Sequence, residues 1–372
     1  MRHPAVESVS DSTFPWAERC RADRPGKVLL MLSEAPAVER FCNGQSVGVG
    51  SLPHRDASAA AAFSIAEFDI ATVPSLPARA HAEGMVAQGV ADMAAVSFDG
   101  VGGLVVDPSL LPQGGTVVVP DLESEAFGGL RAFLHLARQV GVDGLPVKWQ
   151  FVGPVTLGVV LDRAGVPQKD AFRIAVETVR THTAAISAEI SSVLPLSPQS
   201  MVLDEPSLVD LMSSDFPIAP DVAVDLISTG MAAVPSDVVV GLHSCGPVDV
   251  ATMLEAGPQV ISLPVSDGLV DYAGYLGRFI KAGGVIIWGV TPTNGPLPTK
   301  SDRFWRQLSA VWCALVERGV DASDLRIRSL VSPECGLVGH QVSTARRVAR
   351  HTTEIGRKVN AQAISTKLAF GA

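Results

Sequence analysis

The chain has 372 residues, of which 47% are hydrophobic, and a formal net charge of −9 at pH 7. This composition allows one large buried core or two smaller ones. We find no basic stripe, which argues against nucleic acid and anionic membrane surfaces as partners. The apolar runs are broken by Asp, Pro or Gly before about 18 residues, so we expect no membrane-spanning segment.

Five cysteines are spread widely along the chain. Their odd number and spacing do not fit a disulfide framework, and the N-terminal residues lack an apolar signal segment. We therefore expect a cytoplasmic protein with reduced thiols. Cys313 lies in an amphipathic helical pattern over residues 303–319, which predicts a core thiol.

Residues 1–45 are polar and contain no periodic strand, so we interpret them as an N-terminal extension of one large domain over residues 46–372. Within that domain, short apolar runs alternate with helical patterns. Eight runs are predicted to be strands: 46–52, 70–76, 147–153, 200–206, 238–244, 260–265, 284–290 and 325–331.

Continuous apolar strands separated by helices are typical of a parallel sheet covered on both faces. The α/β pattern, the count of eight strands and the chain length favour a TIM (β/α)8 barrel, and one doubly wound sheet is the alternative. Active sites of such barrels lie at the C-terminal ends of the strands. We therefore look for chemistry where each predicted strand ends.

One histidine and two cysteines follow such strands. His243 and Cys245 share one side of an extended segment, and Cys335 follows the last strand. These residues would give Zn²⁺ three protein ligands and leave a fourth position open, as in catalytic zinc sites. The sequence thus predicts zinc as cofactor, with a thiol substrate activated as the thiolate. The alternative for a single histidine at a strand end is a hydrogen-bonded structural residue.

Other polar residues also stand at strand ends. Asp204 is interpreted as a substrate-binding and catalytic residue that holds an ammonium group or handles a proton, and the alternative is that Asp204 or Glu205 caps the following helix. For Glu205 the two interpretations are equally supported. Ser51 is predicted to hold a substrate carboxylate, with a plain strand-to-helix turn as the alternative. Glu83 is a weaker candidate for an amino-group contact. Trp149 and Trp288 are predicted to be core residues.

Seven segments together resemble the catalytic C-terminal domain of the cobalamin-independent methionine synthases, within the superfamily that includes uroporphyrinogen decarboxylase. They occur in family order over about residues 46–340: VGSLPH, PSLPARAHAEGM, QFVGPVTL, LDEP, LHSCG, WGVTPTN and SPECGL. The resemblance implies a zinc-dependent methyltransferase, acting on a small-molecule thiol such as homocysteine and a methyl donor such as methyltetrahydrofolate or methylcobalamin.

By the same resemblance, His243, Cys245 and Cys335 would bind zinc, Ser51 would bind the homocysteine carboxylate, and Asp204 and Glu83 its amino group. Pro264 stands near the position of the family's glutamate ligand, where Ser262 or Asp267 is the nearest substitute. His54 and His340 are candidates for the general acid.

The family's N-terminal half has no counterpart in this sequence. Two alternatives therefore accompany the methyltransferase hypothesis. One is a zinc-dependent thiol alkyl transferase or lyase of the epoxyalkane or methyl-coenzyme M transferase type, and the other is a non-catalytic barrel that binds a metabolite.

Overall fold

The structure is a computed structural model that describes residues 36–99, 102–111 and 120–370. The chain divides into two compact units, Met1–Pro36 and Ala37–Ala372. The second unit contains every element described below. Most of the predicted extension lies outside the described residues, so its boundary at residue 45 stays a prediction.

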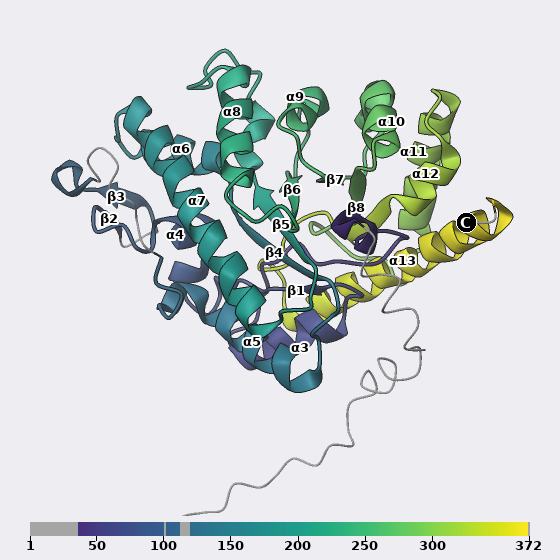
Figure 1. The fold of residues 1–372 in the computed structure, drawn as a ribbon, viewed down its shortest axis with the longest axis horizontal. Coiled ribbons are helices and arrows are strands. Elements are labelled where there is room, and N and C mark those ends of the chain that lie inside the picture. The colour runs from purple at the N-terminus through teal and green to yellow at the C-terminus, as the bar shows by residue number, and fades with distance from the viewer. Residues whose placement is uncertain (1–35, 100–101, 112–119, 371–372) are drawn as a thin grey trace, which may run out of the picture. The chain divides into compact units, whose positions relative to one another are not determined.

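Seven strands form one curled parallel sheet, in the order β1-β4-β5-β6-β7-β8-β9 (Figure 1). Because this order follows the chain, each connection is a crossover to the neighbouring strand, as in half of a parallel barrel. The α/β class and the parallel sheet are confirmed. The strands are β1 (Ala71–Thr72), β4 (Val147–Val152), β5 (Gln199–Asp204), β6 (Val239–His243), β7 (Val260–Pro264), β8 (Val285–Thr291) and β9 (Ser329–Pro333).

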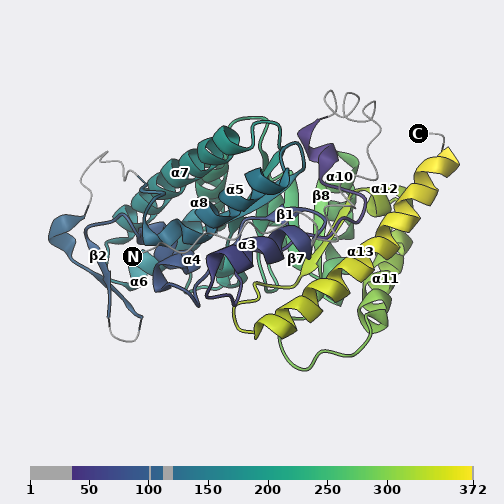
Figure 2. The same cartoon turned by 90° about the horizontal axis from the view of Figure 1, so that it is seen from below.

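Helices α6 to α12 form an arc outside the strands (Figure 1), and α13 packs against β9 and α12 (Figure 2). None of the helices in the described ranges combines the length and low charge that a bilayer span requires. The helices are α3 (Ala57–Ala66), α4 (Met85–Val90), α5 (Gly128–Val140), α6 (Pro154–Arg163), α7 (Gln168–Val193), α8 (Pro220–Met231), α9 (Val250–Glu255), α10 (Ala273–Lys281), α11 (Asp302–Glu317), α12 (Ala322–Ile327) and α13 (Val342–Phe370).

The first predicted strand, 46–52, does not form a regular strand. Ser46 makes an isolated parallel bridge to Val331 in β9, Val47 bridges Ile70 beside β1, and Ser51 bridges Ser75. These bridges place the segment between the two edges of the sheet. The ladder of an eighth strand is missing among the described residues, so the closed eight-stranded barrel stays a prediction.

The last predicted strand, 325–331, begins too early. Its first residues belong to α12, whose N-terminus is capped by Asp321, a carboxylate that accepts from the amides of Ser323 and Asp324. The strand β9 starts at Ser329. The sequence analysis also missed an antiparallel hairpin, β2 (Val96–Phe98) and β3 (Leu104–Val106).

Cys313 is exposed, so its prediction as a core thiol is wrong. The buried face of α11 is formed by Phe304, Leu308, Val311, Trp312 and Leu315. Cys313 follows Trp312 by one residue, about 100° further around the helix, and therefore turns away from that face.

Both faces of the sheet carry buried apolar residues, which explains the largely hydrophobic runs in the sequence. In β8, Ile286 and Trp288 pack in the large cluster with the helices, whereas Val285 and Ile287 pack with Phe41 in a smaller cluster on the opposite face. Trp149 and Trp288 are fully buried, as predicted. Their indole N–H groups donate to side chains, Trp149 to Gln199 and Trp288 to Ser329.

Candidate metal centre

Three soft ligands converge beyond the C-terminal ends of β6 and β9. His243 is the last residue of β6, Cys245 follows it by two residues, and Cys335 lies two residues beyond β9. One ligand atom from each lies within 4.8 Å of the other two. A tetrahedral zinc with its usual bond lengths needs ligand atoms roughly 3.5–3.8 Å apart. The structure therefore brings the predicted ligands close to the spacing of a zinc site.

The imidazole of His243 is buried and held on one side only. Its Nδ1 lies 2.9 Å from the Ser262 hydroxyl, whereas its Nε2 is buried without a hydrogen-bond partner among the described residues. Buried polar atoms without a partner are uncommon in folded proteins. A metal-ligating histidine likewise has one ring nitrogen fixed by a hydrogen bond and the other on the ion, so His243 could serve as a ligand.

The two thiols influence each other strongly. The neighbouring Cys245 thiol, together with the His243 ring, lowers the pKa of Cys335 to about 4. The proximity of Cys335 in turn raises the pKa of Cys245, and burial adds to the effect. The pair thus favours one thiolate at a partly buried position, and thiolates are the form in which cysteine binds metals.

Ser262 orients His243, so its hydroxyl should matter for metal affinity. Replacing Ser262 with alanine is expected to weaken zinc binding by about 10–100-fold, the usual cost of losing a partner of a metal-ligating histidine. Competition with a chromophoric chelator would measure the affinity. The matched control is Ser266→Ala, because Ser266 is exposed and has no contact with His243 among the described residues. Equal affinities for Ser262→Ala and the wild-type protein would contradict the assignment.

Asp204 lies next to the cluster. It ends β5 and is the register partner of His243 in β6. Its Oδ1 is buried without a hydrogen-bond partner among the described residues. Burial raises the pKa of Asp204, while the charges of His243 and Lys148 oppose that rise. A buried acceptor without a donor is suited to an incoming N–H group.

Glu205 has a different role from its neighbour. Its carboxylate accepts hydrogen bonds from the amides of Val155 and Thr156 and from the Thr156 hydroxyl, at 2.6 to 2.9 Å. These groups belong to the first turn of α6, so Glu205 satisfies the free amides of that helix. The capping alternative named the helix that follows Glu205, whereas α6 precedes it in the chain, and the 3-10 helix Pro206–Asp210 has no side-chain cap from Glu205. Burial raises the pKa of Glu205 to about 7, and the bond from Thr156 is the largest effect against it.

Ser51 lies in the segment before α3. Its carbonyl accepts from Leu337 at 2.7 Å, and a Cβ atom at Gly336 would lie 1.8 Å from its hydroxyl oxygen. Ser51 therefore lies against the residue that follows Cys335. The two candidate acids have buried ring nitrogens without partners among the described residues, Nδ1 in His54 and Nε2 in His340. Burial lowers the pKa of His54.

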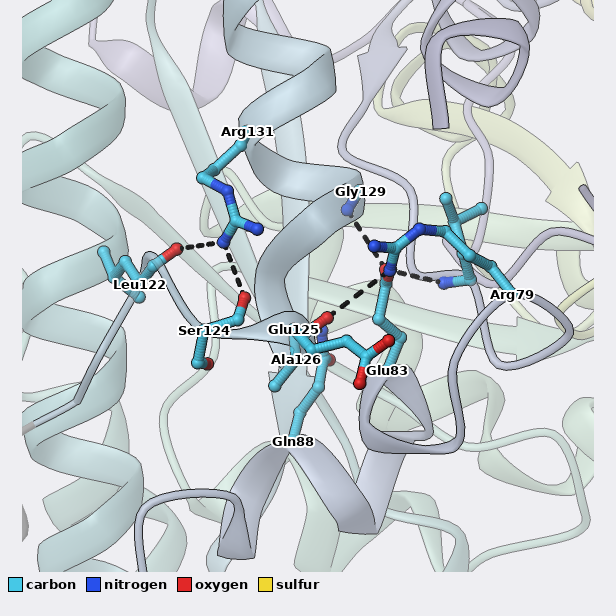
Figure 3. Close-up of polar contacts among 10 residues, drawn as sticks. Arg79, Glu83, Gln88, Leu122, Ser124, Glu125, Ala126, Gly129 and Arg131 are labelled. Carbon is cyan, nitrogen blue, oxygen red and sulfur yellow. Dashed lines mark hydrogen bonds and ion pairs between the residues drawn. The ribbon is translucent and has the colours of Figure 1, made fainter. Parts of the chain in front are cut away.

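Glu83 is engaged by protein groups (Figure 3). Its Oε1 pairs with Arg79 at 2.5 Å, and its Oε2 accepts from the amides of Leu76 and Gly129, each at 3.1 Å. Burial raises its pKa, and the Gly129 amide and Arg79 oppose that rise. The carboxylate ties the segment around residue 76 to the start of α5. The assignment of Glu83 as a contact of the substrate amino group stays a prediction. A substrate bound there would share the Glu83 carboxylate with Arg79.

Gly129 packs tightly beside this carboxylate. A Cβ atom there would lie 2.3 Å from the Pro74 carbonyl oxygen and 2.9 Å from the Glu83 carboxylate. We expect Gly129→Ala to lower the free energy of unfolding by about 2 kcal/mol, since backbone must move to admit the methyl group. Gly339→Ala is the control, because no atom lies within 4 Å of its added Cβ. Urea denaturation of both variants measures this loss of stability. Equal urea midpoints for Gly129→Ala and Gly339→Ala would argue against crowding at Gly129.

No fourth protein ligand joins the cluster among the described residues. Pro264 pairs with Gly289 in the β7–β8 ladder and offers no side-chain donor. Of the two substitutes considered from sequence, Ser262 contacts His243, and Asp267 is an exposed residue outside the cluster. The candidate centre therefore offers three possible protein ligands in the described part of the chain.

Two functional candidates were missed by the sequence analysis. Lys148 is buried in β4 and lines a small cavity together with His243 and Ser262. Gln150, two residues further, shares its side of the strand. The detectable signal was a polar residue at alternate positions of the otherwise apolar segment VKWQFV.

No protein-family model matches this sequence, and no curated protein matches it either. The fold, however, is similar to solved structures. A B12-independent methionine synthase from Shewanella sp. W3-18-1, in complex with selenomethionine, superposes with a TM-score of 0.54 at 14% identity, over 86% of this chain and 98% of that one. A methyltransferase from Methanosarcina mazei superposes with a TM-score of 0.54 at 15% identity, over 87% of this chain and 97% of that one. At these identities the similarities concern the fold, which extends over nearly the full length of both structures.

Proposed function

We propose that this protein is a zinc-dependent enzyme of the methionine synthase type, which transfers a methyl group to a small thiol such as homocysteine. One observation carries the proposal: His243, Cys245 and Cys335 hold their ligand atoms within 4.8 Å of one another beyond parallel strand ends. Zinc bound there would lower the pKa of a substrate thiol so that it reacts as a thiolate.

The protein groups around the cluster have separate tasks in this proposal. Ser262 fixes the ring of His243, and Asp204 offers its unpartnered Oδ1 to the substrate ammonium group. Ser51, which touches Gly336, is placed to donate to the substrate carboxylate. A substrate held at both ends has its sulfur fixed in the cluster, which favours in-line attack on the donor carbon.

The fold neighbours support this proposal. The Shewanella protein, described as a B12-independent methionine synthase, is covered over 98% of its length. It is therefore no longer than this chain, so a single domain of this size is consistent with such an activity. We also propose that residues 46–52 close the sheet into a TIM barrel through the bridges of Ser46 and Val47.

The test is an assay of zinc-loaded protein with homocysteine and either methyltetrahydrofolate or methylcobalamin. We expect methionine, identified by mass spectrometry, from at least one donor. Protein that contains zinc and binds homocysteine but forms no thioether from any donor would instead be a metabolite-binding barrel, and the methyltransferase proposal would be wrong.

The missing fourth ligand favours a second candidate, a zinc-dependent thiol alkyl transferase or lyase. Pro264 leaves the ion with more room for substrate than a site with four protein ligands. A screen of zinc-loaded protein with several thiols and with epoxide and alkyl donors separates the two candidates. Product only from methyl donors would reject the second candidate, and product only from epoxides would reject the first.

A further inference from the structure

The segment 48–51, which carries Ser51, lacks regular ladder partners. The bridges of the preceding residues end at Val47, and the next bridge is that of Ser51. Buried backbone groups need hydrogen-bond partners, so the gap between the bridges must be filled by other means. Side chains fill it: the Gly48 amide donates to the Thr72 hydroxyl at 3.0 Å, and the Lys148 ammonium donates to the Val49 carbonyl.

Gln150 completes this arrangement. Its Oε1 accepts from the Lys148 ammonium at 3.1 Å, and its Nε2 donates to the Val73 carbonyl at 3.0 Å. The side chain also covers Gly50, whose φ is +147° and whose Cβ, if present, would lie 2.2 Å from the Gln150 amide carbon. We term Thr72, Lys148 and Gln150 the polar clasp.

Burying the ammonium group of Lys148 destabilises the fold, which indicates that its charge has a role. Lys148 is 3% exposed, and burial lowers its pKa to about 8, with Asp204 opposing the shift. Desolvating an ammonium group costs free energy that a neutral side chain would not cost. Its position suggests what the charge does, because it lines the cavity beneath His243 and Ser262 and also holds the segment that leads to Ser51.

We propose that Lys148, through the polar clasp, is a positioning residue that fixes segment 48–51 on the sheet and thereby sets Ser51 beside Gly336 and the metal centre. The contact is tight, since Ser51 accepts from Leu337 at 2.7 Å and excludes any side chain at Gly336. The effect on substrate binding rests on the proposed function, whereas the fixation of the segment does not.

The test compares Lys148→Met with Lys281→Met, which makes the same change at an exposed residue. Hydrogen exchange reports on the segment through two amides, because Leu52 donates to the Ser75 carbonyl and Ser75 donates to the Gly50 carbonyl. We expect both amides to exchange about tenfold faster in Lys148→Met. The Ile286 amide, which donates to the Arg328 carbonyl, is the internal reference, and its exchange rate should not change.

Homocysteine is the ligand probe, titrated into cobalt-substituted protein and followed by the visible spectrum. We expect Lys148→Met to retain its metal and to bind homocysteine about tenfold more weakly, a change of about 1.4 kcal/mol. Thr72→Val, which removes the bond to Gly48 without changing the charge, is the second variant if Lys148→Met fails to fold. It should accelerate the same two amides.

If the Leu52 and Ser75 amides exchanged at the wild-type rate in both Lys148→Met and Thr72→Val, the polar clasp would not fix segment 48–51. Faster exchange with unchanged homocysteine affinity would overturn the positioning role of Lys148. A wild-type protein that binds neither metal nor homocysteine would refute the proposed function, and the exchange rates would still decide whether the clasp fixes segment 48–51.

Discussion

Replacing Cys335 with serine is expected to reduce the zinc content of the purified protein from about one ion per chain to less than roughly a tenth of that value. The described residues provide three ligands, so the variant would retain only His243 and Cys245. A serine hydroxyl is a poor substitute because it stays protonated near neutral pH and is a harder ligand than a thiolate. Atomic emission spectrometry of protein purified under reducing conditions measures the content.

The chain provides its own matched control. Cys313→Ser makes the same chemical change at an exposed thiol on α11, outside the cluster, and should leave the zinc content at the wild-type value. A loss of zinc in both variants would point to adventitious binding by thiols. Full zinc in Cys335→Ser, or no zinc in reconstituted wild-type protein, would refute the assignment of the centre.

The fold was predictable where a strand is buried on both faces. Segments such as 260–265 and 284–290 are mostly apolar because alternate residues pack in different clusters, and they became β7 and β8. Segment 46–52 was predicted as a strand on the same grounds. It contains two glycines between its bridges, and side chains replace the ladder there, which a hydrophobic pattern cannot reveal.

The proximity of the His-Cys-Cys cluster was predictable because its residues combine unusual chemistry with a position at strand ends. His243 and Cys335 lie far apart in the sequence, and the curl of the parallel sheet brings them together. Lys148 was not predicted, because a single lysine in a short strand usually marks a solvated position. Only the tertiary structure shows that its ammonium group reaches the Val49 carbonyl inside the sheet.

The sequence distinguished Asp204 from Glu205 only in part, since both stand at the end of the same apolar run. They point to opposite sides of the strand end, and their surroundings differ. Asp204 has an oxygen without a partner beside His243, whereas Glu205 accepts three hydrogen bonds from the first turn of α6. One carboxylate is available to a ligand, and the other is committed to the fold.

The buried Glu205 makes stability depend on pH in a defined window. Burial raises its pKa from 4.5 to about 7. Below pH 4.5 the carboxyl is protonated in both states. As the pH rises from 4.5 to 7, the unfolded chain loses this proton first, so the free energy of unfolding falls, and above pH 7 the contribution is constant. The loss expected from this shift is about 3 kcal/mol.

Glu205→Gln should remove that dependence, because an amide does not titrate. Urea denaturation at pH 4.5, 6 and 8 gives the free energy of unfolding at each pH. The slope of this free energy against pH is then compared between the variant and the wild type. An amide that satisfies fewer of the α6 donors shifts the curve by a constant amount and leaves the slope comparison intact. Glu189→Gln, at an exposed position on α7, should keep the wild-type slope. A wild-type slope in Glu205→Gln would mean that the three donors of α6 keep Glu205 ionised throughout this range, so that hydrogen bonding outweighs burial at this site.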